Sequence, residues 1–375
     1  MDVSDISQTS ILNIGIFNSE CEYHCLSSRV LVGKHNAVNT SELMHQMILP
    51  FENLKPKLCG IISDMAAYQL AANRRFSRMI GIDLQQLVCT LHHVSNDDKY
   101  FNQYFPKAVS AVHSSKMLFG SRQSWASSDC SLRNELEVAL RIEENVGFSP
   151  FRSDRGSRFA VGYQNALSLL KYRELVLRVL ETKRAKEQAA IQPYATELKQ
   201  MLTQDWNSCC LELGMFIIHW RTILCPFYSA LGKIVTLGTG KAFARQLQDQ
   251  YNQLIESSDP FQTMLDFLTP EVAAEYPSLS TVTQMWQVAE NEVKASTNEL
   301  LTQAVQRVHV KVMKDTTKIL ELTGDHDELL PFSNNRCESS FSLIKVSCSY
   351  RVNKLHLFRY SSSSSAFPSK ISWYG

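Results

Sequence analysis

The chain has 375 residues, of which 44% are hydrophobic and 20% are charged. This composition allows a packed core large enough for one big domain or two ordinary ones, and it excludes an intrinsically disordered chain. The formal net charge is +1, which excludes a uniformly basic surface for nucleic acid but leaves room for local basic patches.

Targeting and membrane signals are weak. The opening sequence MDVSDISQTS lacks the basic start and apolar run of a signal peptide, and the ten cysteines are scattered, so we expect reduced thiols in the cytosol or nucleus. The most apolar stretch, 209–231, contains Glu212, His219 and Arg221, which are costly inside a bilayer. We therefore expect it to be a buried helix of a soluble intracellular protein with no membrane partner.

The first hundred residues show α/β patterns. β-prone runs at 11–17 and 23–32 are joined by a polar turn. Helical spacing follows from Asn39, a candidate cap, with Glu42 three residues later. The apolar run 58–62 predicts a buried strand that stops at Ser63 and Asp64, and a helix is predicted over 65–79.

From about residue 100 to residue 325, strand signals give way to helical patterns. Apolar faces run through 167–180 and 286–308, and the sequence from Thr269 through Pro270 to Glu271 predicts a helix start. Residues 361–375 open with five serines and lack periodicity, so we expect a disordered tail.

Three short blocks contain candidate catalytic acids. Asp2 lies in the opening Asp-Val-Ser, Asp64 follows the predicted strand, and Glu338 lies in the block NNRCESSFS. Cys89 and His92 form a Cys-x-x-His pair that begins 25 residues after Asp64. Each block has a plainer explanation when it is taken singly, because an acid after a strand or before a helix is a common loop or capping residue.

The Cys-x-x-His pair does not by itself predict zinc, because zinc takes four ligands and no second pair is evident. Cys21, His24 and Cys25 are the available alternatives as further ligands. Buried packing is the plainer explanation of Cys89 and His92.

In their order along the chain, these blocks resemble the motifs of hAT-type cut-and-paste DNA transposases. That family has Asp-x-Ser/Thr, an Asp after the fourth strand, Cys-x-x-His at a similar spacing, and Glu-x-x-Phe-Ser after a long helical insert. The matching positions here are Asp2 with Ser4, Asp64, Cys89 with His92, and Glu338 with Phe341 and Ser342.

The resemblance implies an α+β fold with an RNase H-like α/β core that is interrupted by a large all-α insertion. It divides the chain into a first part of the core at 1–100, the insertion at 101–325, a returning part of the core with the third acid at 326–360, and the tail at 361–375.

The resemblance also implies that Asp2, Asp64 and Glu338 are catalytic and hold Mg²⁺. Two Mg²⁺ ions about 3.5–4 Å apart can activate a nucleophile and stabilise the leaving oxygen of a phosphodiester, and Mg²⁺ prefers carboxylate oxygens. The implied reaction is hydrolysis at a transposon end followed by strand transfer, with DNA as partner and the nucleus as location. Cys89 and His92 are implied to be structural or to place DNA near the site.

A second resemblance lies in the insertion, where Arg158-Phe159 is similar to the family's Arg-Trp element, whose aromatic ring stacks on bases near the cleavage point. Residues 151–186 contain nine Lys and Arg against three acids, a local charge of +6. With Lys171, Arg173 and Arg178, these residues form a candidate DNA-binding track. The alternatives are that Phe159 is a core aromatic and that the basic residues form a solvated helix face.

The chain departs from the family at its start. The first acid should lie at the end of the first strand, which is central in an RNase H-like sheet, but Asp2 is the second residue. We therefore expect the first strand to be missing and the chain to be a truncated or degenerate copy of a transposable element that is inactive as written. The family's zinc-binding DNA module and dimerising C-terminus are also not recognisable, so a homo-oligomer stays open.

Three functions compete at this stage. The first is a DDE-type transposase that cleaves and joins DNA. The second is a non-catalytic nuclear protein derived from a transposase, which binds DNA or a protein. The third is a helical scaffold with a small α/β cap, in which the three acids lie far apart.

Overall fold

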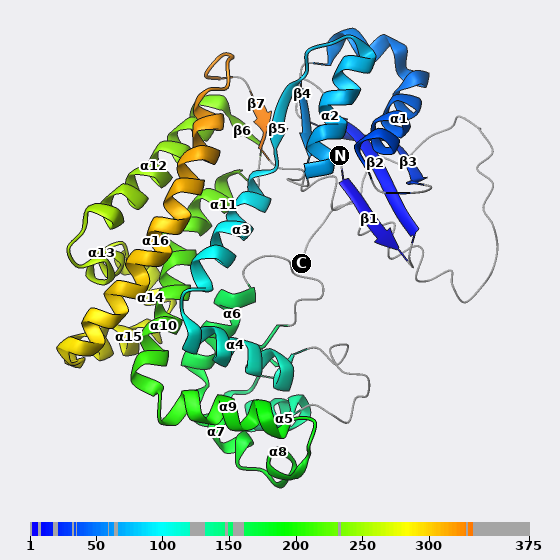
Figure 1. Cartoon of the computed structure of the whole chain (residues 1–375). Helices are drawn as coiled ribbons and strands as arrows, with labels where there is room; N and C mark the ends of the chain where they lie inside the picture. The colour runs from blue at the N-terminus through cyan, green and yellow to red at the C-terminus, as the bar shows by residue number, and fades with distance from the viewer. Residues whose placement is uncertain are drawn as a thin grey trace.

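The computed structural model describes residues 2–6, 9–17, 22–31, 34, 36–58, 60–63, 67–120, 132–146, 149–152, 161–231, 234–327 and 329–332. Within these residues the chain has an α+β fold. Figure 1 shows an α/β part, built from residues up to 88, and a larger helical part that follows it in the chain.

Three antiparallel strands open the α/β part. They are β1 (Asp2–Ile6), β2 (Thr9–Phe17) and β3 (Tyr23–Leu31), in the order β1-β2-β3. β2 and β3 confirm the two predicted strands. Leu12 and Ile14 lie two residues apart in β2, so they share one face of the sheet, and both are buried in the core of this part.

β1 is a strand that the sequence patterns did not predict. The strand begins at Asp2 instead of preceding it, and Asp2 pairs with Asn13 of β2. Residues 2–6 carry no strand signal, because the two apolar residues, Val3 and Ile6, are three positions apart and do not alternate. Pairing with β2 therefore decides its conformation, and β2 has a partner strand on both sides.

A strand-helix-strand unit completes the α/β part. After α1 (Ala37–Ile48) and the 3₁₀ segment η1 (Leu49–Lys57) come β4 (Gly60–Ser63), α2 (Ala67–Ile80) and β5 (Gln85–Val88). β4 and β5 are parallel and form a sheet separate from β1-β2-β3 among the described residues. The cap of α1 is Asn36, whose side chain accepts from the amide of Asn39, so Asn39 is not the cap.

The core of the α/β part is small. Met44 and Met47 of α1 pack with Ile61 of β4 and Phe76 of α2, and α1 lies against α2 (Figure 1). These positions are the apolar face of each helix and the buried face of the strand.

The helical part begins at Thr90, earlier than the predicted boundary near residue 100. Its helices are α3 (Thr90–Asn102), α4 (Pro106–Phe119), α5 (Arg133–Glu144), α6 (Val161–Lys171), α7 (Arg173–Leu180), α8 (Lys183–Glu187), α9 (Gln192–Thr203), α10 (Trp206–Ile218), the π-helix η4 (His219–Leu224), α11 (Cys225–Leu231), α12 (Leu237–Glu256), α13 (Pro260–Asp266), α14 (Pro270–Glu275), α15 (Leu279–Val288) and α16 (Asn291–Leu320). They share one core that reaches from Val94 to Phe332.

Helix boundaries agree with the sequence in some places and differ in others. The predicted start at Thr269 is confirmed, because its hydroxyl accepts from the amide of Val272 at the start of α14. The apolar face at 167–180 is split between α6 and α7 at Tyr172, which has non-helical angles. The face at 286–308 is split at Ala289 and Glu290, both of which are extended.

The most apolar helix lies inside the helical part. By length and composition alone, Trp206–Leu231 could span a membrane. However, 83% of its most apolar stretch is buried inside the protein. The prediction of a buried helix for 209–231 is therefore confirmed. Glu212 is stabilised there by accepting from the amides of Lys107 and Ala108 at the start of α4.

The chain returns from the helical part next to the place where it entered. α3 opens this part and α16 is its last helix, and the two pack against each other (Figure 1). After α16, β7 (Leu329–Pro331) pairs with β6 (Ile234–Thr236), and the buried Phe332 follows. Phe332 lies over Gly240, where an added Cβ would be 2.4 Å from the ring.

Candidate functional site

The carboxyl end of β4 is held in place by α2. Ser63, the last residue of β4, is buried, and its hydroxyl accepts a hydrogen bond of 2.7 Å from the Asn73 side chain. Asn73 in turn accepts from Gln69, one helical turn earlier. The Ser63 carbonyl accepts from the amide of Cys89, at 2.9 Å, just after β5. The residue that precedes Asp64 is therefore fixed from two sides.

The residue that follows β7, Phe332, is hydrogen-bonded beside the end of β5. The Phe332 carbonyl accepts from both the amide and the hydroxyl of Thr90, at 3.0 and 2.6 Å. Thr90 begins α3 and follows Cys89 directly. Ser63 and Phe332 thus bond to consecutive residues, so the segments that lead to Asp64 and to Glu338 both start at the carboxyl ends of β4 and β5.

The structure does not place the side chains of the three predicted catalytic acids. Asp64 and Glu338 lie outside the described residues, and for Asp2 the described feature is the backbone of β1. Cys89 is fully buried at the start of α3, and His92 is half-buried in the first turn of that helix. β1 and β4, which would carry the first two acids, lie in separate sheets among the described residues.

Within the described part of the chain, no group of three or more His, Cys, Asp or Glu side chains is arranged to hold a metal ion. Cys25 is exposed on β3, where its thiol lies 3.9 Å from the Ser28 hydroxyl, and Cys21 lies outside the described residues. The proposed ligands Asp2, Asp64 and Glu338 are hard carboxylate donors, which suit Mg²⁺. The fixed ends at Ser63 and Phe332 give two of these acids a common starting point.

The predicted DNA-binding residues of the insertion are largely engaged inside the protein. Arg158 and Phe159 lie outside the described residues. Arg173 donates to the Leu202 carbonyl at 3.0 and 2.7 Å and lies over the Trp206 ring. Lys171 lies over the Tyr172 ring, and Arg178 pairs with Glu143.

The neighbouring basic residues are also paired. Arg184 bonds to Glu135 at 2.8 Å, and Lys186 and Lys199 both bond to Glu181. Hydrogen bonds from Lys186 and then Lys199 lower the pKa of Glu181 to about 2. The local charge of +6 therefore overstates the free positive charge, because it omits acids such as Glu135 and Glu143 that other segments contribute.

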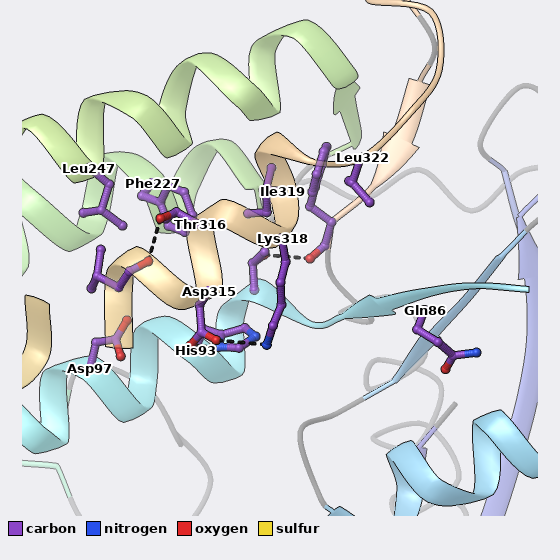
Figure 2. A pocket seen from close by; sticks show the side chains of 13 residues that line it. Gln86, His93, Asp97, Phe227, Leu247, Asp315, Thr316, Lys318, Ile319 and Leu322 are labelled. Atoms are coloured by element: carbon purple, nitrogen blue, oxygen red, sulfur yellow. Dashed lines mark hydrogen bonds and ion pairs between the residues drawn. The ribbon is translucent and has the colours of Figure 1, made fainter. Parts of the chain in front are cut away.

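A cavity of about 40 Å³ lies between α3, α11, α12 and α16, beside Phe332 (Figure 2). It has space for a few water molecules, since one needs about 10–15 Å³. Figure 2 shows His93 of α3 and Lys318 of α16 both directed at Asp315, with Asp97 one turn further along α3.

A charged network connects α3 to α16 at this cavity. Lys311 donates to Asp97 at 2.6 Å and to Asp315 at 2.9 Å, and Asp315 also accepts from His93 and Lys318. Both carboxylates are buried at the contact between the two helices. The network holds the first and last helices of the helical part together next to the Thr90–Phe332 bond.

Burial controls protonation in this network. It raises the pKa of Asp97 to about 7, against the opposing effect of Lys311. Burial also acts to raise the pKa of Asp315, but His93 and Lys311 outweigh it and the pKa is lowered. Burial lowers the pKa of His93, so we assign a neutral ring that donates to an ionised Asp315.

A second buried polar cluster lies further along α3. His219, in the π-helix η4, stacks on Phe101 with 3.6 Å between ring centroids and hydrogen-bonds the Tyr251 hydroxyl at 2.7 Å. Burial lowers the pKa of His219. The ring is therefore a neutral core residue that satisfies Tyr251, and we assign it no ligand.

Sequence reasoning missed the α3–α16 network. The sequence does contain two pairs of charged or titratable residues at helical spacing. His93 and Asp97 are four residues apart, as are Lys311 and Asp315. The sequence could not show that these two pairs face each other.

No family model, curated protein or solved structure matches this chain. The resemblance to hAT transposases therefore depends on the motifs and their order along the chain.

Proposed function

We propose that this protein is a hAT-type DNA transposase, or a protein derived from one, with an RNase H-like core that acts on DNA in the nucleus. Its reaction would be metal-dependent phosphodiester cleavage and strand transfer. The observation that supports this most is the convergence of Ser63 and Phe332 on Cys89 and Thr90. Ser63 directly precedes Asp64, and Phe332 lies six residues before Glu338 in the sequence, so the proposal is supported by the chain positions from which two of the acids follow.

The order of the elements gives further support. Three antiparallel strands, a helix, and a parallel strand-helix-strand unit precede a long helical part, after which the chain returns to the same strand ends. In the proposed core β1 takes the place of the first strand, so that β2 has a neighbouring strand on both sides. The proposed core requires β1 to lie beside β4, which a structure of the DNA-bound protein would test.

In the proposed site, Asp2, Asp64 and Glu338 would hold the Mg²⁺ ions. When bound, the metal ions lower the pKa of the attacking water and neutralise charge on the leaving oxygen. The protein's own contribution is to fix the segments that hold these acids. Asn73 and Cys89 hold the end of β4, and Thr90 holds the returning chain, so that carboxylates from distant segments can share one position.

The test is cleavage of labelled duplex DNA and of supercoiled plasmid by the full chain, with Mg²⁺ or with EDTA. We expect Mg²⁺-dependent nicking that is lost in Asp64→Ala and in Glu338→Ala. The matched control is Asp83→Ala, because Asp83 is an exposed acid before β5 and should not affect cleavage.

Two results would contradict the proposal. Cleavage that survives Asp64→Ala would assign the activity to another site or to a contaminant. DNA binding without cleavage, under conditions in which the protein is folded, would favour the non-catalytic transposase-derived protein.

A further inference from the structure

We propose that the exposed face of α2, formed by Arg74, Arg75 and Arg78, binds the phosphate backbone of duplex DNA. The choice of DNA rests on the proposed function. The surface itself rests on the geometry and charge of α2, and it is separate from the basic segment of the insertion that the sequence suggested.

The two faces of α2 have different roles. Its buried face contains Ala72, Asn73 and Phe76, which pack in the core, and Asn73 holds Ser63 at the end of β4. The three arginines are exposed. They span about 6 Å along the helix axis, since each residue rises by about 1.5 Å. A helix that positions the strand end of the candidate site therefore presents a compact basic face to solvent.

These arginines are not neutralised within the described part of the chain. None of them makes an ion pair, a side-chain hydrogen bond or a ring contact there, and α2 contains no acid. Like charges three or four residues apart on a helix cost about 0.2–0.5 kcal/mol per pair. An external anion would remove that repulsion, whereas Arg178, Arg184 and Lys186 already have internal partners.

The chemistry of the face favours a polyphosphate over other partners. A guanidinium group binds phosphate oxygens through two parallel hydrogen bonds, and several together suit a continuous backbone. A helix that lies on a membrane needs an exposed apolar face, but Ala72 and Phe76 are buried in the core. A protein partner would need apolar anchors, whereas Met79 is the one large apolar side chain that is exposed on α2 among the described residues.

The experiment compares two charge-matched triple variants of the full chain. The first is Arg74→Gln/Arg75→Gln/Arg78→Gln, in which glutamine keeps helix propensity. The control is Lys183→Gln/Lys186→Gln/Lys199→Gln, which removes the same charge from residues with acidic partners. Affinity for a fluorescent duplex is measured between about 50 and 200 mM salt, the range in which phosphate contacts dominate. Circular dichroism checks that both variants fold.

We expect the α2 variant to reduce the slope of log affinity against log salt by about 2–3, since each phosphate contact contributes about 0.9. Its affinity at the middle of the salt range should fall by about tenfold or more. The control variant should keep the slope of the wild type. Equal slopes in wild type and α2 variant would overturn the proposal, as would a wild type that binds no duplex.

Other polyanions are outcomes of the same test. If the α2 variant loses binding to anionic vesicles or to an RNA hairpin while duplex binding is unchanged, the DNA assignment is overturned. This inference can fail separately from the proposed function. Binding through α2 without any cleavage would retain the surface and reject the catalytic proposal, whereas Mg²⁺-dependent cleavage with α2-independent binding would do the reverse.

Discussion

Two of the regions in the helical part where charged side chains pair differ in burial. Between α3 and α16, Asp97 and Asp315 are less than a tenth exposed, while around α7 to α9 the Lys186–Glu181 and Lys199–Glu181 pairs are about half exposed. An exposed pair is screened by water and contributes about 0–1 kcal/mol. A buried charge that loses its partner is far more costly. The same residue types can therefore fix a helix contact in one region and only balance charge in the other.

The largest effect is expected from Lys311→Met, which leaves Asp97 without its amine and Asp315 with one partner fewer. The free energy of unfolding at pH 8, measured by urea denaturation, should fall by about 3–5 kcal/mol. The loss should be smaller near pH 5.5, because Asp97 has a pKa of about 7 and can become neutral there. Lys314→Met, an exposed change on the same helix, should have little effect. Equal losses of unfolding free energy in Lys311→Met and Lys314→Met would contradict the special cost of unpairing the buried carboxylates.

Glu212 extends the comparison to a buried carboxylate whose hydrogen bonds come from amides. Burial raises its pKa to about 7, above its usual 4.5, so the folded state binds the proton more tightly than the unfolded state. The contribution of Glu212 is therefore most favourable at low pH and is lost as pH rises from about 4.5 to 7.

Glu212→Gln removes this titration and can still accept from the two amides. The difference in unfolding free energy between variant and wild type should grow by about 2–3 kcal/mol in favour of the variant from pH 4.5 to 7.5. The measurement is urea denaturation across that pH range. Glu256→Gln, at an exposed acid of α12, is the control, and a flat difference for Glu212→Gln would show that this carboxylate is not desolvated.

Thr90→Val tests the bond that holds the returning chain at the site. It removes the hydroxyl donor to the Phe332 carbonyl and keeps the amide donor, so stability should fall by about 1 kcal/mol. Under the proposed function, Mg²⁺-dependent cleavage should fall more than this stability loss explains, and Thr90→Ser should restore it. If Thr90→Val lowers stability and leaves cleavage intact, the bond has no role in positioning the returning chain.

The smallest effect is expected in the exposed region. A double-mutant cycle with Arg178→Ala and Glu143→Ala should give a coupling energy of about 0.2–1 kcal/mol that falls as salt is added. Thermal unfolding at two salt concentrations measures it. A coupling as large as that of the Lys311 pairs would remove the distinction between buried and exposed pairs.

Local patterns predicted the elements that depend on local chemistry. Strands at 11–17 and 23–32, a helix over 65–79, the cap at Thr269 and the buried helix at 209–231 all follow from periodicity and capping residues. β1 and β5 were not predicted, because Asp2–Ile6 lacks alternation and Gln85–Val88 has only two apolar residues. Both depend on hydrogen bonds to a neighbouring strand.

Charge partners were the least predictable part of the candidate site. Counting acids inside 151–186 missed Glu135 and Glu143, which come from another helix. Residues 151–186 also do not include Arg74, Arg75 and Arg78, and only the fold shows that none of these three pairs with an acid among the described residues. The acids Asp2, Asp64 and Glu338 stay a prediction from motif order, and the fold adds the position at which two of their segments begin.

The contact between α3 and α16 has a consequence for which insertions and deletions such a chain can tolerate during evolution. Because the helical block leaves the strands at Thr90 and comes back at Phe332, its two connections are neighbours. A block attached in this way can be lengthened, exchanged or excised while β4 and β5 before it keep their places. Replacing it with a short linker between these two points is a direct route to a minimal version of the protein.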